Sequence, residues 1–216
     1  VYFVNYDMVQ SEILFLAKGE LFNSNKMAAS MLFNTYFGRG LSSIVFQEIR
    51  ESKSLAYSAF SSYNIASESD KPDYTMAYVG TQANKLEQAV KAMMELMSNM
   101  PEVEDQFNQA KAATLKKIAS QRITKSNIFW SYESLKKRGI NNDNRKQIYD
   151  EIKAMTMEDL KTFFDDNIKN ENYNVMVIGN KKDIDFELKY ENQIIGNGRL
   201  KRYKSWLKYL ISLKVL

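Results

Sequence analysis

The sequence predicts an α+β fold, in which an antiparallel sheet of about five or six strands carries helices packed on one face. The first observation is the order of the expected elements: two strands, two helices, two strands, several helices and a last strand. The second is the length of 216 residues, which suits one sizeable domain. The third is an ordinary globular composition, with 44% hydrophobic and 26% charged residues. Clustered strands and clustered helices favour one sheet with a helical cover over alternating βαβ units.

Strands are expected where apolar and aromatic residues gather between turn signals. These segments are 1–6, 12–17, 55–65, 74–80 and 173–178. Helices are expected where apolar residues recur every three or four positions. The clearest series is Leu86, Ala89, Val90, Met93, Met94 and Met97. Other helices are expected after Asn23, near Ser42, from Val103, and over 126–138, 145–153 and 156–168. The pair Thr156 and Asp159 predicts a capping box at the start of the last helix.

The charge is unevenly placed and divides the chain into a domain over 1–180 and a basic tail over 181–216. The tail holds nine Lys/Arg against four Asp/Glu, a net of +5, so with a total of +4 the domain sums to −1. No basic face in the domain predicts nucleic-acid binding. The segment Lys201–Leu216 suits a basic amphipathic helix. Contact of this tail with a membrane or a polyanion is one expectation, and packing on the domain is another.

The first residue, Val1, already belongs to an expected strand, without a start methionine or a signal peptide, so we expect an excised piece of a longer polypeptide. No apolar run reaches the roughly 18 residues of a membrane span. The absence of cysteine excludes disulfides but selects no compartment. A bacterial periplasm or cell envelope is the location that we favour. Oligomeric state and peptide preference leave no trace in the sequence.

The chain contains no histidine and no cysteine. This excludes the usual zinc sites and the Ser-His-Asp and Cys-His nucleophiles, so the chain is not a peptidase on its own. An all-oxygen calcium or magnesium site would need regularly spaced acids, which the acid-rich loop 67–73 lacks, and we expect a solvated turn there. A Ser-Lys pair within 52–54 has little support, because adjacent residues at a helix end seldom face each other. Gly38-Arg39-Gly40 follows a helix and is expected to be its end and a tight turn, not a phosphate loop.

One corner of the chain brings together side chains suited to catalysis. Arg50 falls in the last turn of an expected helix, and Tyr57 follows where the next strand begins. A guanidinium and a phenol are suitable donors for a peptide carbonyl whose oxygen becomes negative. The alternative is structural, since an arginine in a last helical turn complements the helix dipole and a tyrosine in a strand packs well.

Residues 34–60 resemble the second-half signature of the pitrilysin, or insulinase, family of zinc peptidases, which includes insulin-degrading enzyme and the mitochondrial processing peptidase. The resemblance rests on three segments in order and at family-like spacing, and it extends over about residues 1–180. These segments are Asn34-Thr35-Tyr36-Phe37-Gly38-Arg39-Gly40-Leu41-Ser42-Ser43, Phe46-Gln47-Glu48-Ile49-Arg50-Glu51 and Leu55-Ala56-Tyr57-Ser58.

The resemblance implies one half of a clamshell that closes around a peptide substrate. In this family one half binds zinc through an H-x-x-E-H helix and a further Glu, and the other half supplies an Arg and a Tyr that reach the scissile peptide. Those two residues would be Arg50 and Tyr57 here. Zinc would belong to a partner half, in the same longer polypeptide or in a separate subunit, and no cofactor to this chain. The resemblance also leaves open a catalytically silent interaction module of the same fold, which an upstream H-x-x-E-H segment would argue against.

Overall fold

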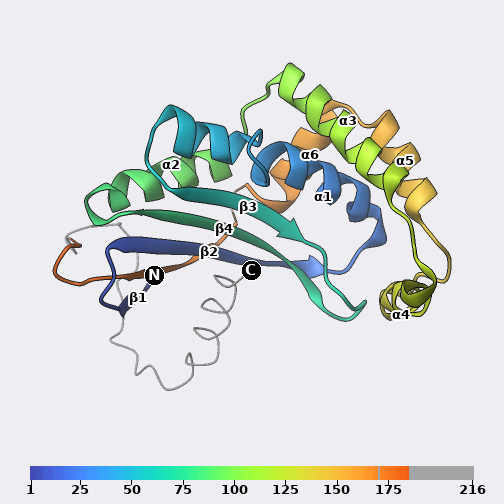
Figure 1. The fold of residues 1–216 in the computed structure, drawn as a ribbon, viewed down its shortest axis with the longest axis horizontal. Coiled ribbons are helices and arrows are strands. Elements are labelled where there is room, and N and C mark those ends of the chain that lie inside the picture. Colours follow the sequence, from blue (N-terminus) through green and yellow to red (C-terminus); the bar gives the residue numbers. More distant parts are fainter. Residues whose placement is uncertain (170, 185–216) are drawn as a thin grey trace.

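The computed structural model describes residues 1–169 and 171–184 and has the expected α+β fold (Figure 1). Five strands form one sheet in the order β1-β5-β2-β4-β3. Their bounds are β1 Tyr2–Asn5, β2 Gln10–Leu21, β3 Ser58–Asn64, β4 Pro72–Gln82 and β5 Asn174–Gly179. The expected tail helix and its membrane contact lie in residues 185–216, outside the described residues. Within the described ranges, no helix is long and apolar enough to cross a bilayer.

The sheet is mixed, which corrects the expectation of a purely antiparallel sheet. Strand β5 lies between β1 and β2, antiparallel to β2 but parallel to β1. The long central pair β2–β4 and the hairpin β3–β4 are antiparallel as expected. Because β5 returns from the helical layer and takes the position beside β2, the first two strands do not pair with each other. Such partner choice depends on contacts remote in sequence, which periodicity does not report.

The helices pack on one face of the sheet, as predicted (Figure 1). They are α1 Met27–Phe33, α2 Leu86–Ser98, α3 Glu104–Ser120, α5 Arg145–Ala154 and α6 Met157–Asn167. Ile13 and Phe15 of β2 alternate with outward residues and meet this layer, so that both are fully buried. The expected apolar series of α2 is confirmed, with Met93 at its buried centre. The capping box of α6, from Thr156 and Asp159, is also present.

Helix α4 (Ile128–Lys137) exists as expected, but its apolar residues do not pack into the core. No residue of the helix is buried, and the large side chains Ile128, Phe129, Trp130 and Tyr132 are all exposed. The helix projects beyond the ends of β3 and β4 in Figure 1. Its C-terminal end is tied to the β3–β4 connection by hydrogen bonds from Ser69 N to Lys137 O and from Arg138 Nε to Ala66 O. Helical periodicity therefore predicted the helix but not its exposure.

Two π-helical segments, η2 (Asn34–Gly38) and η3 (Phe46–Ser52), follow α1 and bring the chain back to β3. Gly38 ends the first of them, as expected of a helix end followed by a tight turn. Its absence of a side chain also allows close packing against β3. A Cβ at this position would overlap the carbonyl oxygen of Ser61 in β3, so only glycine allows this close approach. Gly40, in the turn itself, has a φ of +96°. π-Helical turns occur frequently at functional sites, and the second of these, η3, carries Arg50.

One position on the free edge of the sheet, at Tyr63 of β3, is occupied by a side chain. The amide of Asn34 donates to the carbonyl oxygen of Tyr63 and accepts from its N–H, both at 2.8 Å. These are the two backbone groups that a neighbouring strand would use. Asn34 therefore occupies the place of a pairing strand at this position.

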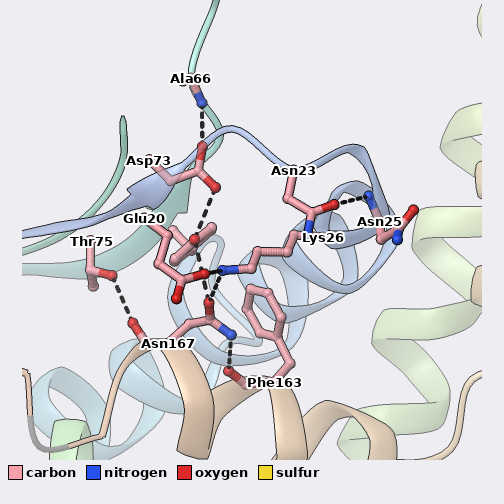
Figure 2. A network of polar contacts seen from close by, with 10 residues as sticks. Glu20, Asn23, Asn25, Lys26, Ala66, Asp73, Thr75, Phe163 and Asn167 are labelled. Atoms are coloured by element: carbon pink, nitrogen blue, oxygen red, sulfur yellow. Dashed lines mark hydrogen bonds and ion pairs between the residues drawn. The ribbon is translucent and has the colours of Figure 1, made fainter. Parts of the chain in front are cut away.

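A partly buried polar network joins the sheet to the start of α1 and the end of α6 (Figure 2). Asp73 is fully buried and accepts hydrogen bonds from the Tyr63 hydroxyl at 2.9 Å and the Ala66 N–H at 2.8 Å. Lys26 reaches both Glu20, at 2.9 Å, and the side chain of Asn167, at 2.7 Å. The expectation of a solvated turn over 67–73 is thus wrong at Asp73, which anchors the start of β4.

Candidate functional site

The corner between η3 and β3 is held by backbone and side-chain contacts from several directions. The chain reverses at Ser54, whose φ of +50° lies in the left-handed region. The Leu55 N–H donates to Ile49 O at 2.9 Å, and the side chains of both residues are buried beneath the corner. Lys85 Nζ donates to Ser54 O at 2.9 Å, and Tyr57 N donates to Gly80 O at 2.8 Å. The corner is therefore a fixed support for the residues that it carries.

Arg50 lies in the last turn of η3, as predicted, and its side chain is 44% exposed. Its guanidinium carbon lies 4.8 Å from the ring centroid of Phe46, a cation–π contact that directs the side chain along the helix. Its Nε lies 3.7 Å from Glu51 Oε1, in a loose ion pair. The terminal nitrogens of Arg50 have no hydrogen-bond partner among residues 1–169 and 171–184, so they are available to an incoming carbonyl.

Tyr57 lies immediately before β3 rather than inside it, because the strand starts at Ser58 and not at the expected residue 55. Its side chain is 51% exposed. The hydroxyl accepts a hydrogen bond of 2.7 Å from Gln82 Nε2, at the end of β4. A phenol that accepts one hydrogen bond retains its own proton for donation. Sequence reasoning missed Gln82, which only the pairing of Ser58 with Gly80 brings beside Tyr57.

Arg50 and Tyr57 lie on the two arms of one corner, yet their side chains make no direct hydrogen bond in the described part of the chain. Each has its own support, from Phe46 and from Gln82 respectively. A guanidinium and a phenol are each suitable donors for an oxygen that carries partial negative charge. A metal site is a different matter: the sequence has no histidine or cysteine, and residues 1–169 and 171–184 hold no group of three or more potential ligands. These residues do not fit a zinc site.

Comparison with known protein families identifies the family of this chain. A family model described as the peptidase M16 inactive domain matches residues 2–114, more than half of the chain. The chain belongs to the peptidase M16 inactive-domain family. This membership confirms the resemblance to the non-zinc half of pitrilysin-type peptidases, and the matched region contains the whole Arg50–Tyr57 corner. No curated protein matches the M16 chain by sequence.

Solved structures share the fold of this M16 domain at low sequence identity. The peptidase M16 inactive domain from Pseudomonas fluorescens is 16% identical over 83% of this chain, with a TM-score of 0.68. A protease from Helicobacter pylori is 15% identical over 82% of this chain, also with a TM-score of 0.68. The periplasmic protease PqqL from Escherichia coli is 15% identical over 83% of this chain, with a TM-score of 0.62. The M16 chain spans only 42%, 43% and 20% of these three chains.

Proposed function

We propose that this M16 domain is the non-zinc half of a zinc-dependent endopeptidase and supplies two donors to the scissile peptide. The observation that carries the proposal is the pair of exposed donors, Arg50 and Tyr57, on one fixed corner inside the family-matched region. The chemistry expected of zinc in the partner half is polarisation of the carbonyl and activation of water. This chain covers less than half the length of two related structures, which is consistent with a second half in the complete protein.

In this proposal the corner acts on the oxygen of the tetrahedral intermediate. The Arg50 guanidinium places a positive charge beside the oxygen, and its terminal nitrogens donate hydrogen bonds. The Tyr57 hydroxyl donates its proton in a hydrogen bond, while Gln82 holds the phenol oxygen from the other side. Both donors favour the transition state over the ground-state carbonyl, because its oxygen carries more charge. Closure of the two halves around the peptide would exclude water and strengthen both contacts.

The test combines the chain with its zinc-bearing half and compares Tyr57→Phe with wild type on a peptide substrate. Loss of one oxyanion donor should lower kcat/KM by about 10²-fold or more. Tyr132→Phe is the matched control, because Tyr132 in α4 is also a 51% exposed tyrosine but lies outside the corner. Arg50→Lys keeps the charge and loses the planar fork, so it should also lower kcat/KM. Equal kcat/KM for the Tyr57 and Tyr132 variants would instead support a catalytically silent module.

We propose a periplasmic location for the assembled protein. The support is the fold shared with the periplasmic protease PqqL. Fractionation of cells that produce the complete protein tests this. Recovery with the cytoplasmic fraction would refute it.

A further inference from the structure

A cleft of about 680 Å³ lies at the opposite end of β3 from the Arg50–Tyr57 corner. Its walls come from α1 and η2, from the C-terminal half of α3, from the end of β3 and the start of β4, and from Arg138, which follows α4. Three cationic side chains, Arg39, Lys117 and Arg138, line it together with amides, hydroxyls and apolar groups. None of the described residues that line it is acidic.

The three cations are not neutralised within the domain. Arg39 Nη2 donates to the neutral Asn64 Oδ1 at 3.1 Å, and Arg138 Nε donates to the backbone carbonyl of Ala66 at 2.8 Å. None of the three forms an ion pair with a carboxylate of residues 1–169 or 171–184. The first 180 residues have a net charge of −1, so this concentration of positive charge is local. Cations of one sign around one cleft raise the local concentration of anions.

Most other polar groups of the cleft already have partners. The Ser30 hydroxyl donates to Met27 O, Thr35 to Met31 O and Thr114 to Ala110 O. The Asn34 amide is engaged with the backbone of Tyr63. Among the described residues, the donors that remain for a ligand are Lys117 Nζ, the guanidinium N–H groups of Arg39 and Arg138 that make no internal bond, and the exposed Tyr74 hydroxyl. Only the first three carry a positive charge.

The shape and lining of the cleft favour an extended ligand over a small ion. The cations come from three separate elements, and half-buried apolar side chains, including Met27, Met31 and Ile65, lie in the same lining. A cleft of about 680 Å³ has room for several side chains. A peptide in which acidic and apolar residues alternate would satisfy both the charges and the apolar surface.

We propose that this cleft binds an acidic peptide segment, through Arg39, Lys117 and Arg138. The cleft shares no residue with the Arg50–Tyr57 corner. The two proposed sites can therefore be tested independently of each other. It would give the domain a contact with a bound peptide at a distance from the Arg50–Tyr57 corner.

The test measures the fluorescence anisotropy of a short labelled peptide of alternating glutamate and leucine, titrated with the full chain. The wild type should bind this peptide, and should bind a matched peptide with glutamine for glutamate much more weakly. Lys117→Gln should raise Kd by about fivefold, the effect of one solvent-exposed charge pair. The double variant with Arg39→Gln should raise it by about 25-fold, if the two charges act independently.

Lys116→Gln is the matched control, because Lys116 is the neighbouring exposed lysine on α3 but does not line the cleft. It removes the same charge and should leave Kd almost unchanged, and thermal unfolding of all variants checks that they are folded. An equal loss in the Lys116 and Lys117 variants, or equal affinity for the glutamine peptide, would overturn the proposal. Displacement of the peptide by inorganic phosphate at equal concentration, or tighter binding to anionic vesicles, would also overturn it, in favour of a free anion or a membrane.

Discussion

The hydroxyl of Tyr63 donates a 2.9 Å hydrogen bond to Oδ2 of Asp73, and both side chains are buried. Burial, followed by the hydrogen bond and the charge of Asp73, raises the pKa of Tyr63 far above its ordinary value, so the phenol remains a donor. The other carboxylate oxygen accepts from the Ala66 N–H. The carboxylate thus ties β3, β4 and their connection into one unit.

Removal of this donor should destabilise the fold. Tyr63→Phe leaves a buried carboxylate with one fewer hydrogen bond and should lower the free energy of unfolding by about 1–3 kcal/mol. Urea unfolding measures the change. Tyr74→Phe is the control, because Tyr74 lies in the same sheet but is exposed. Equal stability of the two variants would contradict the importance of the Tyr63–Asp73 bond.

The close approach of η2 to β3 predicts unequal effects at two neighbouring glycines. Gly38→Ala would force Cβ against the Ser61 carbonyl and should cost about 3 kcal/mol or more. Gly40→Ala meets no atom within 4 Å and costs only the strain of its positive φ, about 1 kcal/mol. Thermal or urea unfolding of both variants gives the order, and a larger loss at Gly40 would refute this packing.

The left-handed conformation of Ser54 predicts a stabilising substitution. Ser54→Gly removes the Cβ that is unfavourable at a φ of +50° and should raise the free energy of unfolding by about 0.5–1 kcal/mol. Ser52→Gly lies two residues earlier, inside η3, and should lower it by a similar amount through helix propensity. If both substitutions lowered the denaturation midpoint, the turn geometry assigned to Ser54 would be wrong.

The capping box of α6 predicts a small pH dependence. Hydrogen bonds from the backbone N–H and then the hydroxyl of Thr156 lower the pKa of Asp159 below its ordinary value. The resulting stabilisation is present above the pKa of the unfolded chain and is lost as the pH falls through the folded pKa. Because Asp159 is exposed, solvent screening limits the effect to about 0.5 kcal/mol.

Asp159→Asn should therefore be less stable than wild type at neutral pH, and the difference should shrink on acidification to about pH 2. Melting temperatures across this range measure it. Glu158→Gln is a control in the same first turn that leaves the capping bonds intact. A difference for Asp159→Asn that is constant with pH would show that its charge is not involved.

Sequence reasoning succeeded where local patterns determine the outcome. The apolar series of α2, the capping box at Thr156 and the Arg50 position in a last helical turn all follow from spacing over a few residues. It failed where distant contacts decide. The insertion of β5 beside β2 and the exposure of α4 depend on the arrangement of elements that are remote in sequence. Asp73 is bound by nearer partners, Tyr63 and Ala66, but apolar periodicity does not report the hydrogen bonds of a carboxylate. The contact between Gln82 and Tyr57 was also missed, because only the register of β3 against β4 brings the two side chains together.

The hydrogen bonds of Asn34 to the backbone of Tyr63 have a consequence for the behaviour of the domain in solution. An edge strand with free N–H and C=O groups invites pairing with another molecule, which leads to aggregation. At Tyr63 those groups are already taken by a side chain from a neighbouring helix. A second copy of the domain, or an extended peptide, would have to displace this amide to lengthen the sheet there. The side chain of Asn34 therefore opposes self-association of the domain at this position of the edge.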